Sequence, residues 1–190
     1  MELFQITKSK LRTALLNLYF INPERSFYLR ELERILGFTV GNIRRELLKL
    51  EKSGLFKSER KGNQVYYSLN YSYPLFHEIK SIISKTSGIS VILKGAVSKI
   101  KGIKCAFIYG SFAKSEERNA SDVDLFILGN VSESDIIKSL KPVEKKIQRE
   151  INYTLYSYKE YADKKLGKDP FVEDVVKCPK IFLIGDENEL

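Results

Sequence analysis

The chain has 190 residues, of which 43% are hydrophobic and 29% are charged, and its formal net charge is +8. This composition is typical of a globular protein and excludes a disordered or fibrous chain. No apolar run is long enough to span a bilayer and no signal-peptide pattern is present, so we expect a cytoplasmic protein with no membrane partner.

The positive charge is concentrated in the first half of the chain. Residues 1–85 hold 15 Lys and Arg against 8 Asp and Glu, whereas residues 86–190 hold 17 against 16. A basic segment joined to a nearly neutral one is typical of a nucleic-acid-binding domain tied to a domain of another kind. We therefore expect two domains, residues 1–85 and residues 86–190, with a short polar break at residues 85–88.

The first half shows apolar residues at helical spacing, followed by two strand-like segments. Thr39 is a plausible N-cap for the third helix, and Gly54 is a suitable residue just after its end. Arg60-Lys61-Gly62-Asn63 joins the two strands as a basic hairpin loop. The helices are expected at residues 9–21, 29–36, 39–53 and 74–84, and the extended segments at residues 27–28, 55–59 and 64–69.

This order of helices, glycine-containing turn and basic hairpin resembles the winged helix of ArsR-like transcription regulators. The resemblance rests on residues 39–70, with Gly54-Leu55 before the hairpin and Tyr66 to Asn70 after it. It implies a double-stranded DNA partner, a third helix in the major groove, a homodimer and a role in transcription regulation. Winged helices also serve as protein-interaction modules, and that alternative stays open. The implied DNA contacts are Thr39, Asn42, Arg44 and Arg45 on the helix, and Arg60, Lys61 and Asn63 on the hairpin.

The second half alternates helices with short apolar segments that are bounded by glycine and serine. Such intermixing predicts a small mixed sheet with flanking helices. Ser157 and Asp169 are expected to cap helices, and Gly167 to end one. The helices are expected at residues 89–100, 132–140, 142–148, 158–166 and 170–176, and the strands at residues 105–109, 125–128, 151–156 and 180–184.

Two features flank the loop between the first two of these strands. Gly110-Ser111 follows one strand, where glycine allows a close backbone approach and N–H groups can hold a phosphate. Asp122 and Asp124 lead into the other strand and share one face of it. Two adjacent carboxylates repel unless a cation lies between them, and carboxylates with phosphates are the ligands that Mg²⁺ prefers. The pattern therefore predicts phosphoryl or nucleotidyl transfer chemistry.

The same stretch resembles the signature of the minimal nucleotidyltransferases in the DNA polymerase beta superfamily. The resemblance implies that Asp122 and Asp124 are catalytic residues that hold Mg²⁺ or Mn²⁺, and that a nucleoside triphosphate is substrate or ligand. It also implies that Gly110, Ser111, Lys114 and Ser121 bind the nucleotide phosphates. The matching residues are Gly110, Ser111, Phe112, Ala113, Glu116, Arg118, Ser121, Asp122, Asp124 and Leu125, while Lys114 replaces an arginine and Ser115 a glycine.

The third expected strand departs from this family pattern. Active members carry a third acid there, and alignment by strand places Asn152 at its position. Asparagine is neutral and cannot act as a base. Glu150 shares the strand face but lies about 6–7 Å away along the strand. Three roles for the second domain stay open: transfer of a nucleoside monophosphate to an acceptor hydroxyl, binding of nucleotide or metal as a signal in a transcriptional regulator, and dimerisation alone.

The expected fold class combines these two parts. We expect an α+β, or mixed α/β, protein with an N-terminal winged helix. A nucleotidyltransferase-fold mixed sheet with flanking helices follows it.

Overall fold

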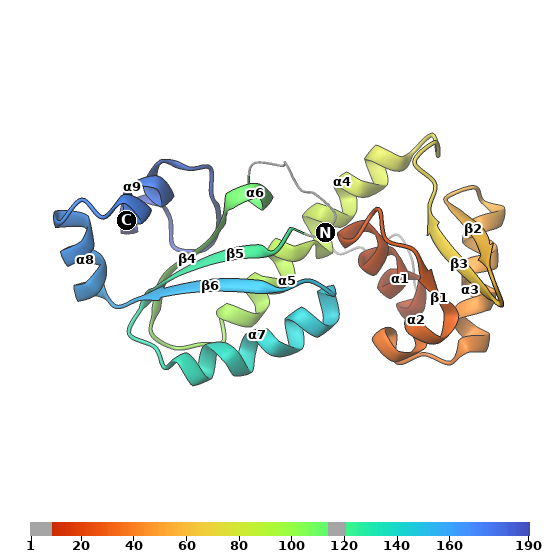
Figure 1. Ribbon diagram of the computed structural model, residues 1–190, viewed down its shortest axis with the longest axis horizontal. Coiled ribbons are helices and arrows are strands. Elements are labelled where there is room, and N and C mark those ends of the chain that lie inside the picture. Colours follow the sequence, from red (N-terminus) through yellow and green to blue (C-terminus); the bar gives the residue numbers. More distant parts are fainter. Residues whose placement is uncertain (1–8, 114–120) are drawn as a thin grey trace. The chain divides into compact units, whose positions relative to one another are not determined.

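The computed structural model describes residues 9–113 and 121–190, and the chain divides into two compact units (Figure 1). The first unit runs to Ile89 and takes in the short segment Lys146–Gln148, and the second unit holds the remaining residues. Both units mix helices with a β-sheet, so the fold class is mixed α+β. Within the described residues, no helix is both long enough and apolar enough to cross a membrane.

The first unit packs its helices on a small antiparallel sheet with the strand order β1-β3-β2. Tyr19 lies at the centre of the core, where its ring meets Phe27 and Phe56 edge to face at 5.1 and 4.7 Å. Such T-shaped pairs suit the ring quadrupoles and hold the first helix against both edge strands. The elements are α1 (Lys10–Ile21), β1 (Phe27–Tyr28), α2 (Leu29–Leu36), α3 (Val40–Lys52), β2 (Phe56–Lys61), β3 (Gln64–Leu69) and α4 (Phe76–Ser87).

Thr39 is the N-cap residue of α3, as expected, but its side chain makes no capping hydrogen bond, and the Glu33 carboxylate accepts the Val40 N–H at 3.2 Å. Two local expectations for this unit are corrected. β2 continues through Arg60 and Lys61, so only residues 62–63 form the hairpin turn. Residues 85–87 belong to α4 rather than to a polar break. The Ser87 hydroxyl donates to Asn17 Oδ1 at 2.6 Å, which ties the last turn of α4 to α1.

The second unit is built on a four-stranded sheet with the order β6-β5-β4-β7, of which Figure 1 labels β4, β5 and β6. β4 pairs antiparallel with β5 and β7, whereas β5 and β6 run parallel. The parallel pair requires a crossover, and α7 provides it. The elements are α5 (Ile89–Val97), β4 (Ile103–Tyr109), α6 (Gly110–Ala113), β5 (Val123–Gly129), α7 (Glu133–Ile147), β6 (Ile151–Tyr156), α8 (Tyr158–Leu166), α9 (Pro170–Lys177), β7 (Ile181–Ile184) and the 3₁₀ turn η2 (Glu187–Glu189).

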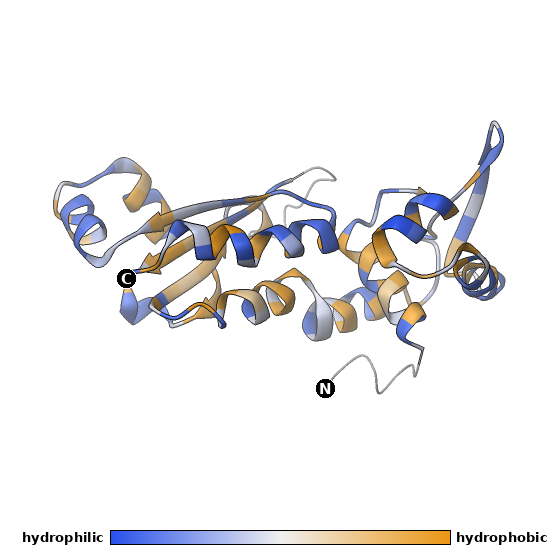
Figure 2. Ribbon diagram, turned by 90° about the horizontal axis from the view of Figure 1, so that it is seen from below, coloured by the Kyte–Doolittle hydropathy of each residue, from blue (hydrophilic) through white to orange (hydrophobic). Residues whose placement is uncertain are grey.

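The central strands of this sheet are buried on both faces. On one face Phe107 stacks on Phe126 at 4.9 Å, and Tyr161 of α8 closes on Phe126. The opposite face carries Ile108 and Leu125, and α5 and α7 lie beneath it (Figure 1). Figure 2 shows these strands as a hydrophobic layer, while the helices have hydrophilic outer sides. Burial on both faces explains why the strands read as continuous apolar runs in the sequence.

Two expectations for this unit are also corrected. Residues 133–147 form one helix, although two were expected on either side of Pro142. Pro142 lies on the exposed side, and burial of Ile136, Leu140 and Val143 compensates for the hydrogen bond that proline removes. After α8, Gly167 keeps a right-handed conformation, and Lys168 adopts the positive φ of 52° instead.

We predict that Phe126→Ala lowers the free energy of unfolding by about 3–5 kcal/mol, because it removes a fully buried ring and leaves a cavity. Denaturant unfolding followed by circular dichroism measures the change. Leu166→Ala serves as the control, because Leu166 is 84% exposed. This substitution should change the free energy of unfolding by less than about 0.5 kcal/mol. Equal losses in the two variants would contradict this account of the core.

Candidate functional site

Asp124 is placed by strand pairing on both sides. It lies opposite Tyr109 of β4 and opposite Asn152 of β6. Residues that pair across neighbouring strands point to the same face of a sheet, so these three side chains share one face. Asp122 comes just before β5 and is half-buried like Asp124. The sheet therefore brings together the two acids predicted from the sequence.

Gly110 follows Tyr109 and begins α6 directly over the Asp124 carboxylate. Its φ is +72°, and a Cβ built at this position would lie 2.3 Å from Asp124 Oδ2. Real Cβ atoms do not approach so closely, and L-residues rarely adopt this φ. Both the backbone conformation and the close approach therefore require glycine here.

Asn152 contacts the acid pair directly. Its Nδ2 donates a hydrogen bond to Asp122 Oδ2 at 3.1 Å, across two strand ends that are 30 residues apart in sequence. The expected alignment of Asn152 with the acid pair is thus present as a contact. An amide nitrogen can donate but cannot accept a proton, so this position supplies orientation rather than a base.

The electrostatics of the acid pair are those of two neighbouring carboxylates. Burial raises the pKa of Asp124 above its ordinary value, and the charge of Asp122 raises this pKa further. Both causes disfavour the ionised form. A cation bound between the two side chains would reverse this effect, because it favours the charged form of each acid.

Tyr109 and Thr154 form the wall beside Asp124. Their side chains share a hydrogen bond, and the Tyr109 ring meets Phe171 of α9 at 6.1 Å. Burial raises the pKa of Tyr109, with a further contribution from the Asp124 charge. Sequence reasoning assigned Tyr109 only to a strand end, because nothing local indicates which residue will lie opposite it.

Arg149 is a second site residue that sequence reasoning missed. Its side chain is buried at 8% exposure, and Nη1 donates to the Ser121 carbonyl oxygen at 3.0 Å. This bond fixes the backbone immediately before Asp122. The sequence gives no signal for the role, because Arg149 follows several lysines and looks like part of a solvated surface.

The remaining residues predicted at this site have different outcomes. Ser111 lies in α6 beside Gly110, whereas Lys114, Glu116 and Arg118 fall outside the described residues. Glu150 is exposed, and its carbonyl oxygen accepts the Val123 N–H at 3.0 Å. Across residues 9–113 and 121–190, no three His, Cys, Asp or Glu side chains are grouped as a metal would require. Glu150 therefore does not complete the acid pair as a third ligand.

The residues predicted to contact DNA all lie on the surface of the first unit. Four of them lie at or near the start of α3, and three lie at the tip of the β2–β3 hairpin. On the hairpin, Arg60 Nε donates to the Gly62 carbonyl oxygen at 3.2 Å, and Lys61 pairs with Glu59 at 3.2 Å. The exposed residues are Thr39, Asn42, Arg44, Arg45, Arg60, Lys61 and Asn63.

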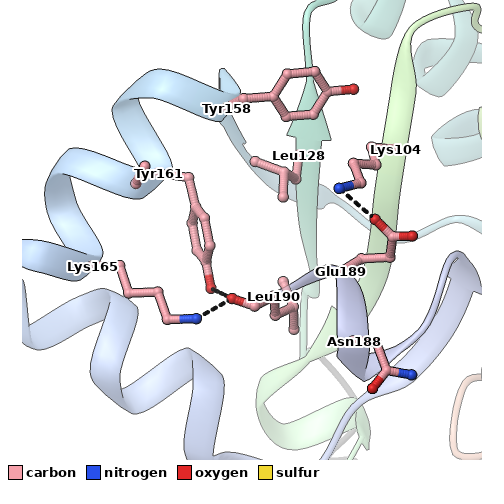
Figure 3. A pocket seen from close by; sticks show the side chains of 9 residues that line it. Lys104, Leu128, Tyr158, Tyr161, Lys165, Asn188, Glu189 and Leu190 are labelled. Carbon is pink, nitrogen blue, oxygen red and sulfur yellow. Dashed lines mark hydrogen bonds and ion pairs between the residues drawn. The ribbon is translucent and has the colours of Figure 1, made fainter.

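A separate pocket of about 580 Å³ lies near the other end of β4, where α8 and η2 meet (Figure 3). Its two lysines are already engaged. Lys104 pairs with Glu189 at 2.8 Å, and Lys165 donates to the Leu190 carbonyl oxygen, as does the Tyr161 hydroxyl at 3.1 Å. The charge of Lys104 is thus paired with a carboxylate, whereas Lys165 is held by a carbonyl oxygen and keeps its charge.

Comparison with known proteins agrees with the geometry around Asp124. Residues 78–170 match the family model described as polymerase beta, nucleotidyltransferase. This part of the chain forms a nucleotidyltransferase-type domain. No curated protein matches the chain.

Two solved structures align with part of this chain. A toxin–antitoxin crystal structure with AMP-PNP aligns over 53% of this chain and 76% of its own, with 14% identity and a TM-score of 0.39. A candidate nucleotidyltransferase from Sulfolobus solfataricus aligns over 49% of this chain and 73% of its own, with 18% identity and a TM-score of 0.28.

We predict that Gly110→Ala lowers the free energy of unfolding by at least about 1–2 kcal/mol, the usual cost of an L-residue in this conformation. The added Cβ also displaces the Asp124 carboxylate. Thermal and denaturant unfolding measure the loss. Gly95→Ala is the matched control, because Gly95 lies in α5 with nothing within 4 Å of the new methyl group. This variant should raise the free energy of unfolding by up to about 1 kcal/mol. A neutral Gly110→Ala would contradict the close approach.

Proposed function

We propose that the nucleotidyltransferase-type domain binds a nucleoside triphosphate together with Mg²⁺ or Mn²⁺ and transfers its nucleoside monophosphate to an acceptor hydroxyl. The observation that carries this proposal is the approach of the Gly110 backbone to Asp124, beside Asp122. A phosphate-binding turn and a pair of hard oxygen ligands then meet at one strand end. The donor set fits the cation, because Mg²⁺ is held by one or two carboxylates with phosphate oxygens completing its shell.

Each residue of the site has a proposed role in this reaction. Asp122 and Asp124 hold the cation, which when bound neutralises charge on the triphosphate and on the leaving pyrophosphate. Gly110 lets the backbone approach the phosphates, and Ser111 and Ser121 offer hydroxyls to their oxygens. Lys114 is proposed to add positive charge. Arg149 holds the backbone before Asp122, so that the acids are in place before the nucleotide binds.

Asn152 favours a second candidate function. Attack by a hydroxyl on the α-phosphate requires the hydroxyl proton to leave, and an amide cannot accept it. The alternative is a transcriptional regulator in which the same site binds nucleotide or metal as a signal without turnover. Both functions use the same residues to bind the nucleotide and differ only in whether an acceptor hydroxyl is activated.

We also propose that residues 1–85 are a winged-helix domain that binds double-stranded DNA, that residues 86–190 are the nucleotidyltransferase-like domain, and that the protein acts as a homodimer in the cytoplasm. The concentration of positive charge in the first half and the exposed basic residues on α3 and the hairpin support DNA binding. In this arrangement α3 lies in the major groove, and the hairpin contacts flanking phosphates.

For the nucleotide site, we predict that ATP or GTP with Mg²⁺ raises the melting temperature of the wild type. A ligand that binds only the folded state raises the free energy of unfolding by about 2.7 kcal/mol when its concentration is a hundred times its Kd. The Asp122→Asn, Asp124→Asn variant should lose the metal-dependent part of this rise. Differential scanning fluorimetry with and without Mg²⁺ measures it.

The matched control for that experiment is Asp163→Asn, Asp174→Asn, which makes the same charge change at two exposed positions of the second unit. It should keep the full rise. If the Asp122, Asp124 variant also keeps it, the nucleotide does not bind at these acids. Pyrophosphate release in the presence of acceptor pools then separates transfer from binding alone.

For DNA binding, we predict that Arg44→Ala, Arg45→Ala weakens binding to duplex DNA and lowers the slope of log K against log salt. Each lost phosphate contact reduces this slope by about 0.9. Fluorescence anisotropy on a random duplex at several salt concentrations measures both. Lys99→Ala, Lys101→Ala removes the same charge from exposed positions of the second unit and should leave the slope unchanged. Equal effects in both variants would indicate general charge attraction instead of a surface on α3.

A further inference from the structure

The hydrogen bond between Asn152 and Asp122 bears on how many cations the site can hold. Asn152 lies opposite Asp124 in the β5–β6 register, and its Nδ2 donates to Asp122 Oδ2 at 3.1 Å. An N–H donor thus lies against one oxygen of the acid pair. In that position a carboxylate would add a third negative charge and could bind a cation, whereas the amide is uncharged and presents its nitrogen rather than its carbonyl oxygen to Asp122.

The charge of the acid pair limits the number of cations. Two divalent cations at the spacing found in two-metal sites repel about four times as strongly as two unit charges at the same distance. Bridging carboxylates normally offset this repulsion. Among the described residues only Asp122 and Asp124 are available, because no third acid, histidine or cysteine joins them. Two carboxylates balance one divalent cation, and a second would depend on the nucleotide phosphates alone.

We infer that this site takes one divalent cation for each bound nucleotide, and that Asn152 is a positioning residue that holds Asp122 for that cation. The inference rests on the proposed nucleotide site and adds the metal count and the role of Asn152 to it. This hydrogen bond restricts the side-chain torsions of Asp122, which precedes β5, and so orients its carboxylate. The N–H group also partly compensates the repulsion between the two neighbouring acids.

The test counts Mn²⁺ per chain with α,β-methylene-ATP, a triphosphate that cannot be cleaved at the reacting bond. Electron paramagnetic resonance reports free Mn²⁺, and the analogue alone provides the blank. We expect one bound Mn²⁺ per nucleotide-loaded wild-type chain and two for Asn152→Asp, which adds the missing carboxylate. Asn152→Ala removes the donor without adding charge, so it should keep one Mn²⁺ but bind it about three- to tenfold more weakly, as one lost hydrogen bond predicts.

The outcomes separate the inference from the proposed function. Two Mn²⁺ on the wild type, or a single Mn²⁺ on a folded Asn152→Asp, would overturn the inference and leave the nucleotide site standing. If the analogue shows no Mn²⁺-dependent binding to any of the three proteins, the proposed nucleotide site fails and the inference fails with it. Thermal unfolding verifies that each variant is folded. If Asn152→Asp does not fold, the wild-type count decides, because one Mn²⁺ supports the inference and two overturn it.

Discussion

The candidate site depends on one close approach, that of the Gly110 backbone to the Asp124 carboxylate. The antiparallel pairing of β4 and β5 places Tyr109 opposite Asp124, so Gly110, the residue after β4, lies over the acid. A Cβ there would displace the Asp124 carboxylate, and only glycine adopts the required φ without strain. The turn at Gly110 and the acid pair are therefore a single structural feature rather than two neighbouring ones.

The sheet core keeps this feature in register. A slip of one residue between strands would turn Asp124 to the opposite face, which α5 and α7 cover. Burial of Phe107 and Phe126 against each other on one face, and of Ile108 and Leu125 on the other, makes such a slip costly. The same core fixes β6 beside β5, which brings Asn152 to Asp122. Apolar packing far from the acids therefore sets the geometry of the polar site.

The two units differ in the physical means by which they would recognise a ligand. In the first unit, exposed cations on one helix and one hairpin suit a long polyanion, where many weak contacts add up. In the second unit, two half-buried acids beside a glycine turn suit a small anion that brings its own cation. The charge distribution between the halves of the sequence matches this difference.

The sequence by itself determined the local elements and the motif. Apolar pattern located α2 and β6, and the capping residue Ser157 located α8. The Gly-Ser and Asp-x-Asp spacing located the acid pair, because neighbours along the chain carry these signals. Only the tertiary structure decided which distant groups meet. The Asn152–Asp122 bond, the buried Arg149 and the continuous helix through Pro142 each depend on strand register or on packing between segments far apart in the chain. Local pattern cannot report them, because the free energy that stabilises them comes from partners the local sequence does not contain.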